Sequence, residues 1–190
     1  DLVKSLLISL GIHAGYFGTK TVRAKRDKYN CNIPFIILFD PTSACNLKCK
    51  GCWAAEYGHS FQLSLDDMRS IVNQGKALGT HFYMLTGGEP LIRKNDVITL
   101  ASENPECTFL IYTNATLIDE DKIKLFKENP PQIVNITLYA TSRETYGNLC
   151  GVPEAYDRVI WAIKALKEAG INVNINYTVT PYNKDDVLEA

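Results

Sequence analysis

Five runs of apolar, β-branched and aromatic residues recur along the chain, separated by stretches with helical spacing. Short runs of this composition are typical of β-strands. The predicted strands are Pro34–Asp40, His81–Thr86, Cys107–Thr113, Gln132–Ala140 and Asn172–Thr180.

Four of the stretches between these runs are predicted to be helices. Ser64 and Asp67 have the spacing of a capping box at the start of the first, and Gly170 can end the last. The predicted helices are Ser64–Gly79, Lys94–Glu103, Asp119–Glu128 and Tyr156–Gly170. Because strands alternate with helices, we expect an α/β fold with right-handed βαβ units and a parallel sheet.

The number of units predicts part of a barrel. A (β/α)₈ barrel of about 250 residues allots about 31 residues to each unit, so residues 33–190 accommodate about five βα units. Residues 1–32 contain no matching unit and are expected to form an N-terminal extension, a helix followed by a basic linker. Lys184–Ala190 has a helix-like pattern without a stop signal, so we expect a barrel that is incomplete at its C-terminal side.

Composition narrows the class of protein. Of the 190 residues, 46% are hydrophobic and 22% are charged, which excludes disordered, collagen-like and coiled-coil chains. The formal net charge of −1 gives no general attraction to nucleic acid or to anionic membranes. The apolar stretch Leu6–Tyr16 is too short to span a bilayer, and the basic residues follow it, contrary to a secretory signal. We therefore expect a cytoplasmic protein without a membrane span.

Three of the six cysteines lie within eight residues, directly after the first predicted strand. Cys45, Cys49 and Cys52 have the spacing C-x₃-C-x₂-C in a loop, which indicates metal ligation in a reducing compartment. No fourth ligand lies at comparable range, so a four-iron cluster held here would keep one iron open. Two alternatives are a structural zinc site completed by His59, and unrelated cysteines of the core.

A second motif, Thr86-Gly87-Gly88-Glu89-Pro90, ends the second predicted strand. Two glycines allow the backbone to approach a ligand closely, and Glu89 supplies an anionic acceptor. A tight turn without a ligand would show the same residues.

The cysteine loop, followed one βα unit later by Gly-Gly-Glu-Pro, resembles the radical S-adenosylmethionine (radical SAM) superfamily. The resemblance extends from about Ile33 to the end of the chain and implies a partial (β/α)₆ barrel. It also implies a [4Fe–4S] cluster, held by the three cysteines, whose open iron binds the methionine part of S-adenosylmethionine. Gly87, Gly88 and Glu89 would receive the methionine ammonium group.

Two further cofactor contacts are implied by position at strand ends. Asn114 and Thr137 match polar groups that hydrogen-bond the ribose and carboxylate of the cofactor in this superfamily. The alternatives are that Asn114 only begins a turn, and that Thr137 is an ordinary strand residue. The chain departs from the family at Gly51, where an aromatic residue usually precedes the third cysteine, and Trp53 follows it instead. Trp53 would pack over the cluster or cover the barrel mouth.

The segment ITLYATSRETYGNLCGV is similar to the barrel of peptide-modifying members that carry a cysteine-rich SPASM domain. An arginine that often binds the cofactor carboxylate is replaced here by Cys150, and Arg143 is a substitute or a solvated residue at a helix start. Cys107 is expected in the core. Other residues near the cysteine loop could face the substrate or the solvent: Asp40, Glu56 and His59.

The activity implied by the resemblance is reductive cleavage of S-adenosylmethionine to a 5′-deoxyadenosyl radical, which abstracts hydrogen from a substrate. An electron donor of flavodoxin or ferredoxin type is implied as a partner. The look-alike segment and the open barrel favour a peptide substrate over a small metabolite. Two other classes stay open, an iron–sulfur electron-transfer protein without catalysis and a zinc-stabilised binding module.

Overall fold

A five-stranded parallel sheet forms the centre of the computed structural model, which describes residues 7–54, 58, 60–128 and 133–188. The strands lie side by side in chain order, and every neighbouring pair is parallel. They are β1 (Ile36–Phe39), β2 (Phe82–Leu85), β3 (Thr108–Thr113), β4 (Ile133–Leu138) and β5 (Val173–Tyr177). Each lies inside a run predicted to be a strand, which confirms the α/β fold; Gln132 is outside the described residues.

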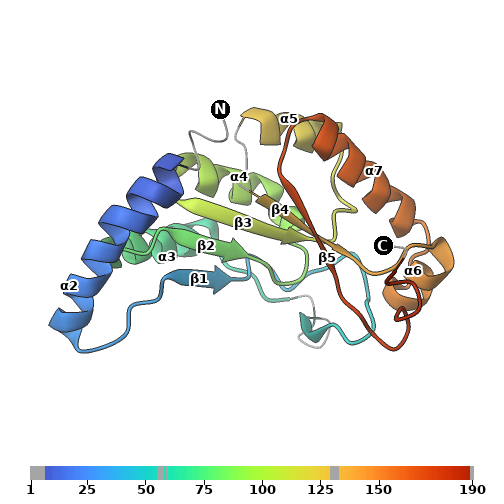
Figure 1. Cartoon of the computed structure of the whole chain (residues 1–190), viewed down its shortest axis with the longest axis horizontal. Helices are drawn as coiled ribbons and strands as arrows, with labels where there is room; N and C mark the ends of the chain where they lie inside the picture. The colour runs from blue at the N-terminus through green and yellow to red at the C-terminus, as the bar shows by residue number, and fades with distance from the viewer. Residues whose placement is uncertain (1–6, 55–57, 59, 129–132, 189–190) are drawn as a thin grey trace.

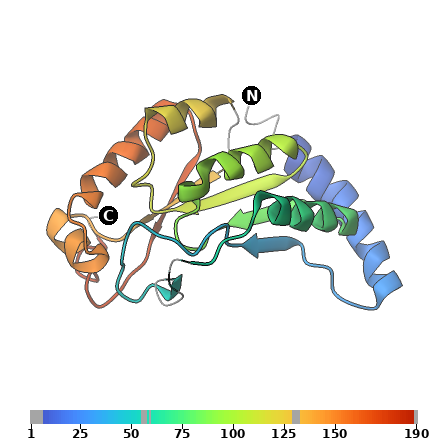
Figure 2. The same cartoon turned by 180° about the vertical axis from the view of Figure 1, so that it is seen from behind.

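The predicted helices pack on one face of this sheet (Figures 1 and 2). They are α3 (Leu65–Leu78), α4 (Lys94–Glu103), α5 (Glu120–Glu128) and α7 (Ala155–Glu168). The capping box at the start of α3 is confirmed: Ser64 Oγ accepts a hydrogen bond from the Asp67 amide at 3.0 Å, and Asp67 Oδ2 accepts one from the Ser64 amide at 2.9 Å. The alternation of strands with helices therefore produces five units of an open barrel.

The main hydrophobic core lies between the sheet and these helices. Tyr83 and Phe109 stack with ring centroids 5.4 Å apart, and the Tyr83 hydroxyl donates to the Val72 carbonyl at 3.0 Å. Gly75 of α3 permits this contact, because a Cβ there would lie 2.3 Å from the Tyr83 oxygen. Strand residues two positions apart share a face, so the same core contains Leu85, Ile111, Val134 and Ile136.

The alternate strand residues point to the opposite face, which these four helices do not cover (Figures 1 and 2). On β1 to β3 this face is apolar, with Leu38 and Met84 among its residues. On β4 and β5 it is polar, and it presents Asn135, Thr137, Asn174 and Asn176. The inner face of the open barrel thus has an apolar part and an amide-rich part.

The N-terminal segment differs from the prediction of a helix plus a basic linker. A π-helix, η1 (Leu7–Gly18), continues directly into α2 (Thr19–Tyr29), so the basic residues are themselves helical. Lys and Arg are good helix formers, and α2 ends only at Asn30, whose φ of 50° is left-handed.

Three further differences concern short segments. α6 (Arg143–Cys150) was not predicted, because its eight residues include Gly147 and Asn148, which disfavour helix. A 3₁₀ helix, η3 (Pro90–Arg93), follows the Gly-Gly-Glu motif. The helix expected at the C-terminal side is wrong for residues 184–188, which form turns and bends. Among the described residues, no helix is long and apolar enough to cross a membrane.

Candidate functional site

The cysteine loop crosses the carboxyl ends of the strands and is fastened to the Gly-Gly-Glu motif by backbone hydrogen bonds. The amide of Gly88 donates to the Thr42 carbonyl at 3.0 Å, and the amide of Glu89 donates to the Ala44 carbonyl at 2.8 Å. The two motifs that are distant in the sequence therefore form one structural unit.

Both glycines of the motif are required by this close approach. A Cβ on Gly88 would lie 2.1 Å from the carbonyl oxygen of Ala44, far inside contact distance. Gly87 has a φ of +107°, and a Cβ there would lie 2.7 Å from the Thr42 carbonyl oxygen. Because the neighbouring atoms are backbone, a side chain at either position would push the cysteine loop away.

The C-terminal end of α6 holds the other side of the loop. The Lys50 amide donates to the Leu149 carbonyl at 2.8 Å, and the Lys48 amide donates to the Cys150 carbonyl at 3.3 Å. These carbonyls belong to the last turn of α6. Carbonyls in the last turn of a helix have no N–H donor within the helix itself. α6 thus supplies acceptors that fix the backbone between Cys45 and Cys52.

Glu89 is fully buried and its carboxylate joins two strand ends. Oε1 accepts from the Leu91 amide at 3.0 Å and from the Thr113 hydroxyl at 2.7 Å, and Oε2 accepts from the Asn114 amide at 2.8 Å. Burial raises the pKa of this carboxyl, and the three hydrogen bonds oppose that rise. A carboxylate has about four acceptor positions, so one position on Oε2 is left for a further donor.

Asn114 connects this carboxylate to the cysteine loop. Its side-chain Nδ2 lies 3.0 Å from Asn46 Oδ1 and 3.8 Å from the Cys45 sulfur. Its Oδ1 accepts from the Thr116 amide at 3.0 Å, as expected for a residue that begins a turn. Asn114 therefore both forms the turn and faces the cysteine loop.

The thiols of the loop are close enough to affect one another electrostatically. Burial raises the pKa of Cys45, and nearby Glu89, Cys49 and Cys52 add to this rise. The pKa of Cys49 is lowered instead, chiefly by a hydrogen bond from the Cys150 thiol. Cys49 is thus the thiol whose surroundings favour the thiolate, the form that binds metals.

Two tyrosines and Cys150 lie next to Cys49. Tyr139 also hydrogen-bonds Cys49, and its ring packs edge-on against Tyr146 with centroids 6.3 Å apart. The Tyr146 hydroxyl is buried without a hydrogen-bond partner among the described residues. Cys150 is fully buried next to this group. No sequence pattern predicts that Cys150 lies against Cys49, because 101 positions separate them.

The donor set fits an iron–sulfur cluster. Three partly buried thiols share one loop whose backbone is fixed on both sides, and thiolates are the ligands that such clusters take. Within the described ranges, no three His, Cys, Asp or Glu side chains are grouped as a single metal ion would need. His59, which the zinc alternative requires, and Glu56 lie outside the described residues.

The remaining residues singled out in the sequence are dispersed. Thr137 lies on the inner face of β4, paired in register with Asn176, and no hydrogen bond between described residues joins it to Glu89. Trp53 is 52% exposed beside the third cysteine. Arg143, at the start of α6, forms an ion pair with Asp157 at 2.8 Å. Both side chains are exposed, which agrees with the alternative that Arg143 is a solvated residue at a helix start. Cys107 is a core residue, as expected, and burial raises its pKa to about 12.

Asp40 directly follows β1 and lies next to Gly87. Its Oδ1 is buried and has no hydrogen-bond partner among the described residues, and burial raises the pKa of the carboxyl. A Cβ on Gly87 would lie 2.8 Å from the Asp40 Cβ. Asp40 therefore supplies a hydrogen-bond acceptor without a described partner beside Gly87, where the cysteine loop meets the Gly-Gly-Glu motif.

The amide row on β4 and β5 also keeps unused hydrogen-bonding capacity. Asn174 Nδ2 donates to Asn135 Oδ1 at 3.0 Å and to Asn176 Oδ1 at 3.4 Å. The Nδ2 groups of Asn135 and Asn176 are buried and have no partner in the part of the chain that the structure describes. Asn135 is only 4% exposed. Two amide donors on the inner face are thus available to a ligand.

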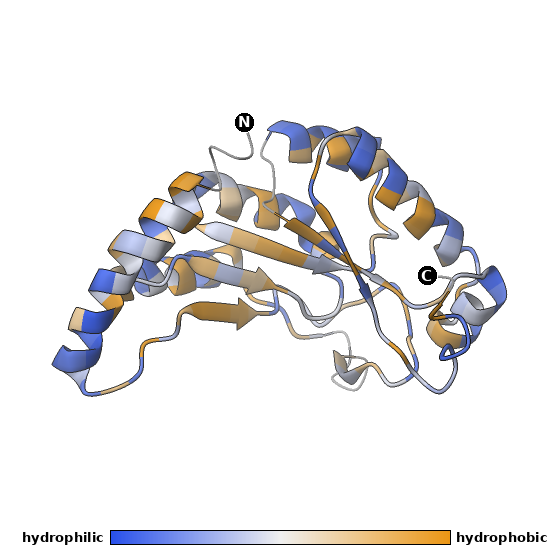
Figure 3. Cartoon of the chain, in the orientation of Figure 1, coloured by the Kyte–Doolittle hydropathy of each residue, from blue (hydrophilic) through white to orange (hydrophobic). Residues whose placement is uncertain are grey.

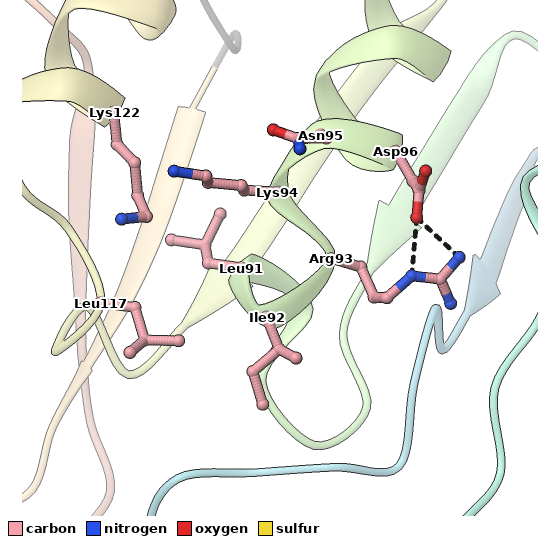
Figure 4. A pocket seen from close by; sticks show the side chains of 8 residues that line it. All are labelled: Leu91, Ile92, Arg93, Lys94, Asn95, Asp96, Leu117 and Lys122. Carbon is pink, nitrogen blue, oxygen red and sulfur yellow. Dashed lines mark hydrogen bonds and ion pairs between the residues drawn. The ribbon is translucent and has the colours of Figure 1, made fainter.

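A separate pocket lies on the other side of the Gly-Gly-Glu turn, among η3, the start of α4 and the segment before α5 (Figure 4). The ion pair of Arg93 with Asp96 borders it, at 2.6 Å, and Arg93 also donates to the Leu63 carbonyl at 2.8 Å. Arg93 therefore stabilises the segment around Leu63, which follows the cysteine loop. None of the thiols lines this pocket.

Two groups of this site escaped the sequence analysis. Thr113, which donates to Glu89, carries no motif and is identified only by its position before Asn114 at a strand end. The carbonyls of Leu149 and Cys150 in α6 are backbone groups, which no side-chain pattern in the sequence identifies.

Comparison with known proteins places most of the chain in one family profile. Residues 39–190 match the profile described as the radical SAM superfamily. The chain is 27% identical over 163 residues to an AdoMet-dependent heme synthase of Methanosarcina barkeri, which covers 84% of this chain and 46% of that protein. It is 29% identical over 171 residues to a GTP 3′,8-cyclase of Clostridium perfringens, with 86% and 52% covered.

The fold is similar to that of SuiB of Streptococcus suis. The crystal structure of SuiB bound to S-adenosylmethionine superimposes with a TM-score of 0.74 and 26% identity, over 90% of this chain and 40% of that one. Another SuiB structure, bound to the precursor peptide SuiA, gives the same score over 39% of that chain. The chain therefore spans about half, or less, of the length of these relatives.

Proposed function

The chain belongs to the radical SAM superfamily, whose enzymes use a [4Fe–4S] cluster and S-adenosylmethionine, and from this premise we propose that it is the barrel of a radical SAM enzyme acting on a peptide. The family and the partial barrel inferred from the sequence are confirmed. We assign the barrel to residues 33–190 and treat residues 1–32 as an extension. The observation that carries the proposal is the fastening of the cysteine loop to Gly88 and Glu89.

Cys45, Cys49 and Cys52 are the proposed cluster ligands. When bound, the cluster and S-adenosylmethionine supply a 5′-deoxyadenosyl radical that removes hydrogen from the substrate. The chain holds the three thiols in one loop and keeps the pKa of Cys49 low through Cys150 and Tyr139. It also shields part of each thiol from water.

The methionine end of the cofactor is proposed to lie against Gly87, Gly88 and Glu89. Three of the four acceptor positions of Glu89 are taken by the chain, and the fourth suits one N–H of an ammonium group. Asn114 lies between this carboxylate and Cys45, and is proposed to contact the cofactor. Thr137 is proposed as a weaker contact from the neighbouring strand.

The peptide substrate is supported by the amide row. Asn135 and Asn176 have buried Nδ2 donors without a described partner, and a peptide offers a carbonyl acceptor at every residue. An unpaired buried donor costs free energy until a ligand pairs it. The likeness to SuiB, which is known in complex with a precursor peptide, supports the same class. The alternative is a small metabolite, since the relatives include a GTP cyclase and a heme synthase.

The partners follow from this chemistry. We propose a one-electron donor of flavodoxin or ferredoxin type and a reducing cytoplasmic setting, because cluster reduction needs a low potential. An electron-transfer protein without cofactor cleavage would not need the fastened Gly-Gly-Glu motif. A zinc module would be colourless, whereas an iron–sulfur protein is brown.

The experiment is anaerobic reconstitution with iron and sulfide, followed by S-adenosylmethionine and dithionite. We expect a brown protein and release of 5′-deoxyadenosine, and stimulation of that release by peptides encoded next to the gene. Release stimulated only by a metabolite extract would refute the peptide substrate and keep the enzyme class. A brown protein that releases no 5′-deoxyadenosine would refute the enzyme class.

A further inference from the structure

The N-terminal helical arm, residues 7–29, contacts the barrel through its small residues. Ser9, Ala14 and Gly18 of η1 are buried. A Cβ on Gly18 would lie 2.6 Å from the carbonyl oxygen of Gly79, so the helix backbone rests directly on the end of α3. This contact fixes one face of the arm on the body.

The outward face of η1 carries bulky apolar side chains. In an ordinary surface helix the apolar stripe faces the core and the polar residues face water. Here the small residues face the body, and five large ones lie in water with exposed fractions of 38–67%. These five residues, the apolar face of the arm, are Leu7, Ile8, Ile12, Tyr16 and Phe17. So many within eleven positions mark an interaction surface.

The next turns of the same arm are cationic. α2 contains one acidic residue, Asp27, and none of its residues is buried. Five cations, the basic residues of the arm, are distributed around α2 and form no ion pair with an acidic residue in the described ranges: Lys20, Arg23, Lys25, Arg26 and Lys28. Figure 3 shows the change from apolar to hydrophilic residues along the arm.

We propose that this arm docks the protein on an anionic membrane surface. The apolar face would enter the boundary between headgroups and acyl chains, and those basic residues of the arm that point toward the membrane would contact the anionic headgroups. The net charge of −1 does not oppose this, because charges more than about 8 Å from the surface are screened at physiological salt. A nucleic acid would use the cations and leave the apolar face in water.

The position of the arm suits such docking. It lies at the amino ends of the strands, whereas the cysteine loop lies at their carboxyl ends, on the other side of the molecule (Figures 1 and 2). Docking would therefore leave the candidate site open to its partners. The proposal does not depend on the chemistry of that site.

Flotation of the chain with lipid vesicles tests the proposal. We expect flotation with vesicles that contain phosphatidylglycerol, little with pure phosphatidylcholine, and at least a tenfold weaker affinity in high salt. The paired changes Ile12→Ser with Phe17→Ser, and Lys25→Gln with Arg26→Gln, should each lower the affinity about tenfold or more. Ile12, Phe17 and Arg26 are exposed and Lys25 is half-buried, so circular dichroism should show an unchanged fold.

Matched control variants distinguish binding through the arm from nonspecific adsorption to vesicles. Val179→Ser, and the pair Lys164→Gln with Lys167→Gln on α7, change exposed residues of the same kinds and should leave flotation unchanged. Equal loss in the control variants, or no flotation with anionic vesicles, would overturn the proposal. So would an arm variant that changes only self-association in light scattering, since the apolar face would then bind a second copy.

Discussion

Two regions of the open barrel, the cysteine loop at the strand ends and the amide row on β4 and β5, differ in how completely their polar groups are hydrogen-bonded. Around the cysteine loop, the amides of Gly88, Glu89 and Lys50 all have carbonyl partners, and three donors surround the Glu89 carboxylate. On β4 and β5, the buried Nδ2 groups of Asn135 and Asn176 have no partner among the described residues. The first region thus has one acceptor position left, on Glu89 Oε2, whereas the second retains two amide donors.

The largest effect is expected when the cysteines of the cysteine loop are replaced, and the quantity measured is bound iron. Ser in place of Cys45, Cys49 or Cys52 should remove nearly all bound iron after anaerobic reconstitution, because only these cysteines share one loop. Cys31→Ser, an exposed control, and Cys107→Ser should keep it. Normal iron in Cys49→Ser would sink the ligand assignment.

Gly88→Ala tests whether the close approach of the two motifs is needed. Its Cβ would lie 2.1 Å from a backbone oxygen, and overpacking of this kind costs roughly 3 kcal/mol. For a chain of this size we expect the melting temperature to fall by about 6–12 °C, and S-adenosylmethionine binding to be lost.

Gly11→Ala is the matched control, because a Cβ on Gly11 meets no atom within 4 Å. It should melt at the temperature of the parent or up to about 4 °C higher, because Ala favours a helix over Gly by about 0.5–1 kcal/mol. If Gly88→Ala melts as the control does, the contact between the motifs has been overestimated.

Glu89→Gln should act on cofactor affinity more than on the cluster. Loss of a charge-assisted hydrogen bond costs about 1.5–3 kcal/mol, which corresponds to a dissociation constant for S-adenosylmethionine raised about tenfold or more. Equilibrium dialysis with labelled cofactor measures this, with iron content as the control. Unchanged affinity at full iron content would show that Glu89 serves only the turn.

The smallest effect is expected in the unpaired region. Asn135→Leu should weaken binding of a responsive peptide about three- to tenfold, the value of one neutral hydrogen bond. Thermal stability should change little, because removal of a buried Nδ2 that has no partner among the described residues offsets loss of the hydrogen bond from Asn174 to Asn135 Oδ1. Weaker S-adenosylmethionine binding with unchanged peptide binding would assign Asn135 to the cofactor instead.

The sequence predicted the elements of both regions but not the contacts between them. Apolar, β-rich runs and helical spacing located the five strands and four of the helices in the described part of the chain, and α4 has the predicted bounds Lys94–Glu103. These patterns reflect local burial, which neighbouring residues determine. The sequence also located the cysteines and the Gly-Gly-Glu motif that the fold brings together.

What could not be predicted depends on partners distant in the chain. α6 is stabilised as much by the cysteine loop, whose amides bond to its carbonyls, as by its own weak helix formers. The effect of Cys150 on Cys49, and the pairing of Asn135 with Asn174, require the positions of residues more than 35 apart. No local pattern encodes such pairs.

The attachment of the cysteine loop to Gly88, Glu89 and α6 has a consequence for the stability of the loop without a cluster. Because backbone carbonyls and amides hold the loop, we expect it to keep its shape without iron, unlike a zinc finger, which unfolds without its metal. A cluster destroyed by oxygen could be rebuilt in the same folded chain. We expect superimposable far-ultraviolet circular dichroism before and after iron removal; a large loss of helix on removal would contradict this.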